Sequence, residues 1–273
     1  MGFPDVPDAE NSTPPRAPVR EQASWYRAWL GPHRIDSKLL ALFLGVAVGL
    51  LGLFWLGSEV LEGDTFALDK LIIRSLRTAQ DASQPIGPGW LRSSVIDVTA
   101  LGGVTVLTII TIMVVGFLVA SRKTGMALFV AAAVASGALV NTALKGFFVR
   151  PRPELVSHLI EVSSASFPSG HAMNSAMVYL TLAALLARSQ ERPGLRLYLL
   201  AIAILLTFLV GMSRVYLGVH WPSDVIAGWC VGAIWAVLCS LAGKHLQRRR
   251  TIDPPEPPSE EPGVRVSTHT LGA

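Results

Sequence analysis

The sequence predicts an all-α polytopic membrane protein with six transmembrane helices packed in a bundle. Two observations support this fold class. Hydrophobic residues make up 51% of the chain and charged residues only 15%, whereas an average soluble domain is roughly 25% charged. The apolar residues are also concentrated in six long runs. Lipid permits only helices or closed barrels to span it, and these runs are too long for barrel strands.

The first apolar run, residues 39–57, has 19 residues without a charge. At 1.5 Å per residue, such a helix crosses a hydrocarbon core of roughly 30 Å. Five further runs of comparable character follow, at 95–120, 126–148, 171–187, 197–213 and 222–246. The run at 95–120 contains one acid, Asp97.

We expect four regions along the chain: a disordered cytoplasmic tail at 1–37, the first transmembrane helix with an extracytoplasmic interfacial segment at 38–89, a catalytic core at 90–247, and a second disordered cytoplasmic tail at 248–273. Both tails are rich in proline and lack an apolar core, so the first is not expected to be a signal peptide.

A short helix is expected to lie in the membrane interface at residues 66–77. Its polar residues Lys70, Arg74 and Arg77 share one side, and several leucines gather near the other. Such a helix could guide a lipid toward a site or serve only as a structural surface element, and the sequence favours neither.

The distribution of basic residues predicts the orientation in the membrane. Fifteen of the 23 Lys and Arg residues fall on one side if both termini are cytoplasmic. The positive-inside rule therefore places both termini in the cytoplasm and the opposite loops outside. Because most basic residues sit beside span ends, the net charge of +4 does not indicate nucleic-acid binding.

Three short patterns in the second half of the chain combine cations, imidazoles and a carboxylate. They are Lys145-(six residues)-Arg152-Pro153, Pro168-Ser169-Gly170-His171, and Ser213-Arg214-(five residues)-His220-(three residues)-Asp224. Charged groups next to membrane spans are costly and default to a functional interpretation. All three patterns are expected on the extracytoplasmic face.

Three of these residues are cations suited to a tetrahedral oxyanion. Phosphoryl transfer depends mostly on positioning and on neutralising charge over three oxygens. Arg152 and Arg214 each offer a planar fork of two parallel hydrogen bonds, and Lys145 adds a point charge. Prolines after Arg150 and Arg152 should end the third span and display both arginines on an extended segment. Arg150 is the weaker candidate, because no pattern requires it.

The second pattern is typical of a helix start that binds an anion. Ser169 is a natural N-cap, and Gly170 lets the backbone approach a ligand closely. Free N–H groups at a helix start bind anions. His171 would then lie in the first turn, where it suits a general acid for the leaving oxygen.

The third pattern suits an activated nucleophile. His220 and Asp224 are four residues apart, so their side chains can meet. A carboxylate on one ring nitrogen fixes the tautomer and leaves the other nitrogen free to attack phosphorus. Two histidines and a carboxylate could instead bind a metal, but three neighbouring cations would repel it, so neither a metal nor another cofactor is expected.

Taken together, the three patterns resemble the signature of the type 2 phosphatidic acid phosphatase (PAP2) family, a relative of vanadium haloperoxidases. The resemblance covers roughly residues 90–245 and implies a metal-independent membrane phosphatase with six helices. It implies His220 as nucleophile, Asp224 as its orienting partner and His171 as leaving-group acid. The implied phosphate ligands are Lys145, Arg152, Ser169, Gly170 and Arg214.

Two other functions remain open on the sequence alone: a vanadate-dependent haloperoxidase, and a lipid-binding membrane protein without catalysis. The expected partner is a membrane lipid phosphate, such as phosphatidate, phosphatidylglycerophosphate or undecaprenyl pyrophosphate. No local motif selects among these lipids.

Overall fold

The structure is a computed structural model that describes residues 37–62, 67–162 and 164–249. Nearly all of both expected tails lies outside these residues. Within them the regular structure is helical, apart from an isolated bridge between Arg77 and Pro85, and the all-α expectation is confirmed.

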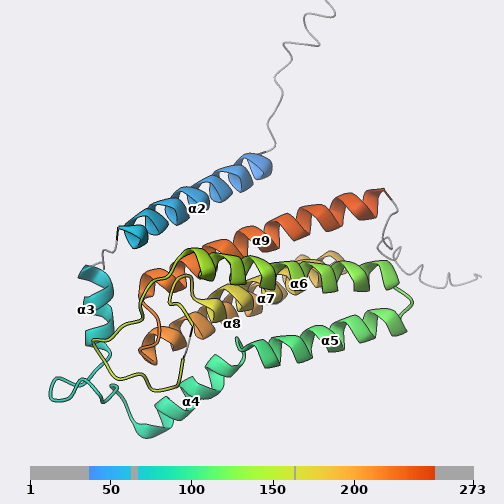
Figure 1. Cartoon of the computed structure of the whole chain (residues 1–273). Coiled ribbons are helices and arrows are strands. Elements are labelled where there is room, and N and C mark those ends of the chain that lie inside the picture. The colour runs from blue at the N-terminus through green and yellow to red at the C-terminus, as the bar shows by residue number, and fades with distance from the viewer. Residues whose placement is uncertain (1–36, 63–66, 163, 250–273) are drawn as a thin grey trace, which may run out of the picture. The chain divides into compact units, whose positions relative to one another are not determined.

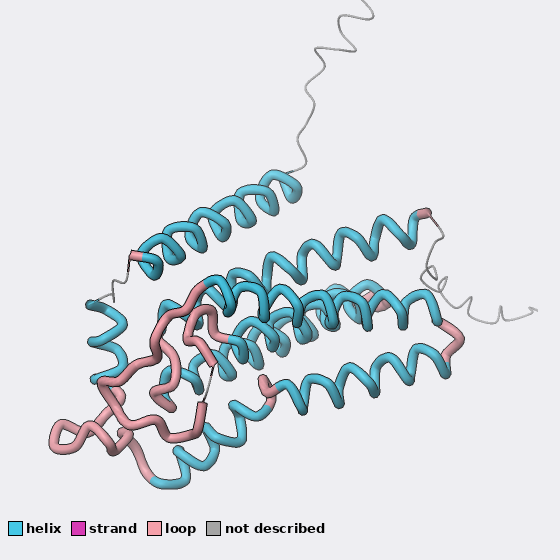
Figure 2. Tube along the Cα trace, viewed as in Figure 1, coloured by secondary structure: helices cyan, strands magenta, loops and turns pink. Residues whose placement is uncertain are grey.

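Figure 1 labels the helices in chain order and Figure 2 separates them from the loops. Their bounds are α2 Ser37–Leu61, α3 Ala67–Ser75, α4 Gly89–Ala100, α5 Val104–Ala120, α6 Thr124–Phe147, α7 Gly170–Arg188, α8 Pro193–Tyr216 and α9 Pro222–Arg248. The chain divides into two compact units between residues 45 and 46. The first contributes the opening turns of α2, and the second holds everything that follows.

Five of the described helices are long and apolar enough to cross a membrane: α2, α6, α7, α8 and α9. The remaining expected span, at residues 95–120, is broken. Its residues belong to α4 and α5, which meet at an angle of 48°. The break falls at Leu101–Gly103, where a side chain on Gly102 would collide with Val210 and crowd the backbone of His171. The bend therefore lets this segment pass close to the expected catalytic region.

Helix α7 is the centre of the second unit and packs most extensively against α8 and α9. Its contact with α9 is made by small residues at four-residue spacing. Gly228 and Gly232 of α9 face Ala172 and Ala176 of α7, and a Cβ on either glycine would collide with that helix. Small residues at this spacing let two membrane helices approach closely. The close packing fixes the start of α7 against the start of α9.

Helix α3 confirms the short helix expected at 66–77, but its faces differ from the expected ones. Leu68 and Leu71 are exposed, whereas Asp69, Ile73 and Arg77 are buried. Arg77 was expected on the polar side; it instead donates a hydrogen bond of 3.0 Å to the carbonyl of Tyr216. The segment that follows α3 is thus held to the last residue of α8.

Candidate active site

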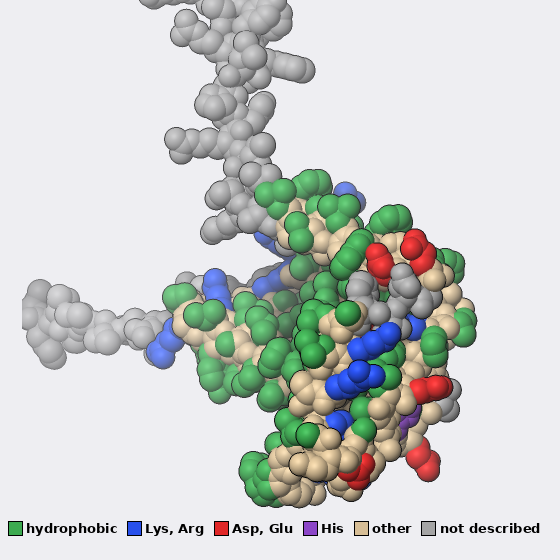
Figure 3. Space-filling view, turned by 90° about the vertical axis from the view of Figure 1, so that its left-hand side faces the viewer, with side chains coloured by type: hydrophobic (Ala, Val, Ile, Leu, Met, Phe, Trp, Pro, Cys, Tyr) green, Lys and Arg blue, Asp and Glu red, His purple; other side chains and the backbone are tan. Residues whose placement is uncertain are grey.

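Two loops carry the three sequence patterns to one end of the helices. One joins α6 to α7 and the other joins α8 to α9. The first loop is closed on itself by a backbone hydrogen bond from Ser166 N to Arg150 O (2.9 Å). It is tied to the second loop by a bond from Leu159 N to Leu217 O (3.1 Å), and to the start of α9 by one from Ser169 N to Asp224 O (3.0 Å). Figure 3 looks onto this end, where Lys and Arg side chains gather near the middle and acidic groups lie around them.

His220 and Asp224 meet as expected. Asp224 Oδ2 lies 3.5 Å from His220 Nδ1, and both side chains are buried. The same Oδ2 accepts hydrogen bonds from the backbone N–H of Trp221 (2.9 Å) and from Ser166 Oγ (2.5 Å). Asp224 therefore caps the start of α9 and orients the imidazole at once. Because its carboxylate accepts a hydrogen bond from Nδ1–H, the lone pair of His220 resides on Nε2.

The Nε2 atom of His220 faces a cation. Arg152 Nη1 lies 3.2 Å from it and 2.5 Å from the carbonyl of Val219. Burial lowers the pKa of His220 to about 4, and the charges of Arg152 and Arg214 act in the same direction, while the hydrogen bond and charge of Asp224 oppose them. His220 is consequently neutral at pH 7, as a nitrogen nucleophile must be.

Arg152 and Lys145 converge on one short segment of the loop before α7. Arg152 Nε donates to the carbonyl of Ser164 (2.8 Å) and its Nη2 to the hydroxyl of Ser164 (3.2 Å). Lys145 Nζ donates to the carbonyl of Ala165 (2.7 Å). None of these partners is a carboxylate, so both cations keep their charge for a ligand.

Ser169 and Gly170 lie where the sequence places them, directly at the start of α7. Ser169 is the N-cap, but its hydroxyl makes no capping bond. That oxygen is buried and has no hydrogen-bond partner within the described residues. Gly170 lies against Lys145, because an added Cβ would stand 3.2 Å from Lys145 Cε. A buried hydroxyl without a partner is costly, and an anion bound here would supply one.

Arg214 is buried and only partly satisfied. Its Nη1 donates to the hydroxyl of Thr99 on α4 (3.1 Å), while its Nε has no partner among the described side chains. His171 lies in the first turn of α7, close to the break between α4 and α5: an added Cβ on Gly103 would stand 3.9 Å from His171 Nε2. No hydrogen bond joins the His171 ring to a described residue.

The sequence did not reveal the role of Arg150. Its Nη1 donates to Asp224 Oδ1 (2.6 Å) and to Ser223 Oγ (2.8 Å). Its Nη2 forms an ion pair with Asp69 of α3 at 3.3 Å. Asp69 Oδ1 also accepts the backbone N–H of Ser223 (2.9 Å). Arg150 thus links α3 to the carboxylate that orients His220.

Thr99, Ser166 and Asp69 were also missed. Ser166 stands in a short serine-rich run and Thr99 in an apolar run, so neither has a distinguishing local pattern. Asp69 offered one signal, as an acid within an otherwise basic and apolar amphipathic helix. Its partner is 81 residues away along the chain, and only the fold brings the two together.

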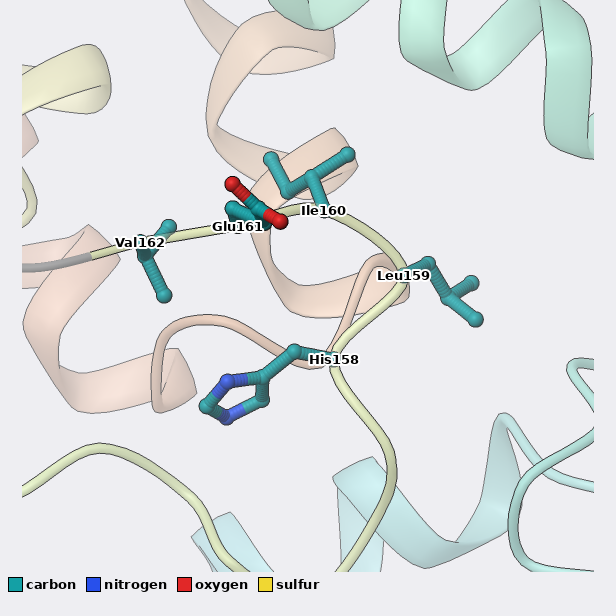
Figure 4. A pocket seen from close by; sticks show the side chains of 5 residues that line it. All are labelled: His158, Leu159, Ile160, Glu161 and Val162. Carbon is teal, nitrogen blue, oxygen red and sulfur yellow. The ribbon is translucent and has the colours of Figure 1, made fainter.

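A surface cleft of about 810 Å³ borders residues 158–162 of the same loop. In Figure 4 the side chains of His158 and Leu159 point away from each other, and His158 is fixed by a 2.8 Å contact to the carbonyl of Pro153. No expected catalytic residue lines this cleft. Among the described residues, no three His, Cys, Asp or Glu side chains gather as a metal site.

Comparison with known proteins identifies similar chains. Residues 126–248 match the family model of the PAP2 superfamily. Phosphatidylglycerophosphatase B of Bacillus subtilis is 34% identical over 164 residues, which cover 59% of this chain and 79% of that protein. An undecaprenyl-diphosphatase of Sulfolobus acidocaldarius is 41% identical over 76 residues, 28% of this chain and 32% of that one.

Solved structures include a similar fold. The crystal structure of a transmembrane PAP2 type phosphatidylglycerolphosphate phosphatase from Bacillus subtilis has a TM-score of 0.65 and 30% sequence identity, covering 74% of this chain and 98% of that one.

Proposed function

This chain belongs to the PAP2 superfamily, and from that premise we propose that it hydrolyses a phosphomonoester or pyrophosphate of a membrane lipid through a phosphohistidine on His220. The observation that carries this proposal is the environment of the His220 ring. Asp224 occupies Nδ1, and Nε2 faces Arg152 at 3.2 Å. A phosphate drawn to Arg152 would therefore meet the attacking lone pair.

In the first step, His220 Nε2 forms a bond to phosphorus and the bond from phosphorus to the leaving oxygen breaks. His171 gives a proton to that oxygen. In the second step, water gives a proton to His171 and attacks the phosphohistidine, which releases phosphate and regenerates neutral His220. Asp224 stabilises the imidazolium character that develops on the ring in each step.

The phosphate oxygens are proposed to bind the five groups that lack carboxylate partners: Lys145, Arg152, Arg214, the hydroxyl of Ser169 and the backbone at Gly170. Fixed donors of this kind stabilise the charge of the transition state without reorganising during the reaction. Hydrolysis by this arrangement needs no metal. The relatives described above are phosphatases and a diphosphatase, which favours hydrolysis over haloperoxidase chemistry.

The lipid substrate is proposed from the chemistry that those relatives share. One is named for phosphatidylglycerophosphate and another for undecaprenyl diphosphate, and both compounds are lipids whose polar end terminates in a phosphate. Purified protein should be assayed against phosphatidate, phosphatidylglycerophosphate and undecaprenyl pyrophosphate in EDTA. Release of phosphate from at least one lipid in chelator, inhibited by vanadate, is the expected result. Activity that needs added magnesium would contradict the mechanism.

Phosphoenzyme trapping tests the covalent step. Brief reaction with labelled substrate, followed by a quench that avoids acid, should leave label on the protein as phosphohistidine. The label should be absent from His220→Ala and retained in His158→Ala, whose ring lies outside the site. Label that persists in His220→Ala would show that another group is the nucleophile.

The proposed orientation has both termini in the cytoplasm and the active site on the extracytoplasmic face of the bacterial inner membrane, as the distribution of basic residues favours. Reporter fusions at Ala273 and at Ser157 should report inside and outside, respectively. Both reporters on the same side would contradict this topology.

A further inference from the structure

A second polar cleft lies far from the active site, between the distal ends of α7 and α9. Its volume is about 550 Å³, and it is lined by Arg188, Ser240, Leu241, Lys244, Gln247 and Arg248. Helix α7 begins at Gly170 in the phosphate site and ends at Arg188. At 1.5 Å per residue these ends are roughly 27 Å apart, so the cleft belongs to the opposite edge of the membrane.

The lining is positively charged and uncompensated. It has three cations and no carboxylate. Arg188 Nη2 donates to the hydroxyl of Ser240 (2.6 Å) and to its carbonyl, while Arg188 Nη1 is buried without a hydrogen-bond partner in the described part of the chain. No ion pair joins Lys244 or Arg248 to a described residue. Leaving the buried Arg188 Nη1 without an acceptor is costly, and an anion in the cleft would provide one.

The cleft continues into an apolar stripe on the same face of α9. Residues at spacings of three and four share a helix face, which groups Leu238 and Leu241 with Lys244 and Arg248. Leu238 and Leu241 are 52% and 45% exposed. The basic groups stand nearer the helix end and the leucines nearer the membrane centre. This order matches a lipid, whose anionic headgroup lies at the interface and whose acyl chain points inward.

We propose that this cleft binds the headgroup of an anionic phospholipid in the leaflet opposite the active site. Basic pockets between membrane helices suit lipid phosphates. The leucine stripe distinguishes a lipid from a free phosphate, which would gain nothing from it. Attraction of anionic lipid by general surface charge is a different explanation, because all cations at this edge would then contribute equally to lipid affinity. If the cleft is the binding site, Lys244 and Arg248 should contribute more to lipid affinity than Arg192 and Arg196, which lie at the same edge but outside the lining.

The test uses the full-length protein with vanadate present, so that retained lipid does not report on the active site. Native mass spectrometry would measure retention of phosphatidylglycerol against phosphatidylcholine. Each cation in contact with the anionic headgroup should strengthen binding about fivefold, so the double variant Lys244→Gln/Arg248→Gln should lose about 25-fold in phosphatidylglycerol affinity. The matched double variant Arg192→Gln/Arg196→Gln should lose less than about threefold.

Four results would overturn the proposal. An equal loss in the two double variants would show surface charge without a site. Equal retention of the two lipids by the native chain, or displacement of lipid by millimolar inorganic phosphate, would remove the lipid as the specific occupant. Tighter phosphatidylglycerol binding after Asp253, Glu256, Glu260 and Glu261 are all changed to amides would show that the acidic C-terminal segment occupies the cleft instead.

Discussion

Arg150 and Arg152 are separated by one residue and have opposite surroundings. The side chain of Arg150 is 4% exposed and lies between the carboxylates of Asp69 and Asp224. Arg152 donates to two carbonyls and a hydroxyl, and its Nη1 faces the nitrogen of His220. One guanidinium is already neutralised by carboxylates, whereas the other keeps its charge.

The difference separates cations that hold the fold from cations available to a ligand. A buried charge needs a partner of opposite sign, and Arg150 has two within the protein. Arg152, Lys145 and Arg214 have only neutral partners among the described residues, so a phosphate would complete their environment. The sequence does not show this distinction, because it depends on where Asp69 lies in space.

The largest effect is expected from the nucleophile. His220→Ala should lower kcat by at least about 10⁴-fold on every substrate, because no other group replaces the attacking nitrogen. The measurement is phosphate release from a lipid phosphate and from p-nitrophenyl phosphate. His158→Ala is the matched control and should stay within about twofold, as expected of a surface substitution outside the site. Comparable losses in the two variants would place the nucleophile elsewhere.

The next largest effect on catalysis is expected from Arg152, the cation with neutral partners. Arg152→Gln should lower kcat/KM by about 10² to 10³-fold, the usual cost of removing one fixed donor to transition-state charge. Its melting temperature should change little, since the hydrogen-bond partners of Arg152 are uncharged and the substitution leaves no buried charge unpaired. Arg152→Lys should recover part of the activity, because the charge returns without the fork. A large drop in melting temperature would show that Arg152 is structural.

Arg150, the cation between two carboxylates, should affect stability rather than phosphate binding. Arg150→Gln leaves two buried carboxylates unpaired, which costs about 3 to 5 kcal/mol in the free energy of unfolding. For a unit of this size the melting temperature should fall by about 10 °C. Asp69→Asn removes one carboxylate only and should cost less. A melting temperature unchanged in Arg150→Gln would contradict the assignment of Arg150 as a structural cation.

Loss of the leaving-group acid should depend on the substrate. His171→Ala should reduce hydrolysis of a lipid phosphate by about 10² to 10⁴-fold, but reduce hydrolysis of p-nitrophenyl phosphate much less, because p-nitrophenolate leaves without a proton. The two rates are compared in the same variant preparation. An equal loss on both substrates would mean that His171 binds phosphate rather than protonating the leaving oxygen.

The smallest effect is a displacement of the pH profile. Because burial lowers the pKa of His220 to about 4, the acidic limb of kcat/KM should lie near pH 4, after correction for ionisation of the substrate. The unfolded chain, with a histidine pKa near 6.5, binds more protons than the folded chain between these values. The contribution of His220 to the free energy of unfolding therefore rises with pH across this window and levels off above it. A limb near pH 6.5 would contradict the burial of this ring.

Sequence reasoning was most successful where the signal is local. Long apolar runs predicted the helical class and the approximate position of each span, because a membrane imposes length and composition directly. Helix-start signals placed Ser169, Gly170 and Pro222 at the first turns of α7 and α9, as the structure has them. The break within 95–120 was missed, since the close approach of Gly102 to Val210 is a tertiary contact.

Within the site, spacing correctly brought His220 to Asp224, which are close in the chain. It did not reveal Arg150, Asp69, Thr99 or Ser166, whose partners lie 54 to 115 residues away. The hydroxyl of Ser169 is a further difference, because it does not cap the helix and remains available to a ligand. Contacts between distant segments define these residues, and no single segment encodes them.

The most direct test of the contrast between Arg150 and Arg152 is vanadate affinity, which reports phosphate binding without turnover. A hydrogen bond to a charged group contributes about 1.5 to 3 kcal/mol, so Arg152→Gln and Arg214→Gln should each weaken vanadate binding by at least about tenfold. Asp69→Asn, which alters only the surroundings of Arg150, should stay within about threefold. Equal weakening in Arg152→Gln and Asp69→Asn, or none in Arg152→Gln, would contradict the division of these cations into ligand-binding and structural groups.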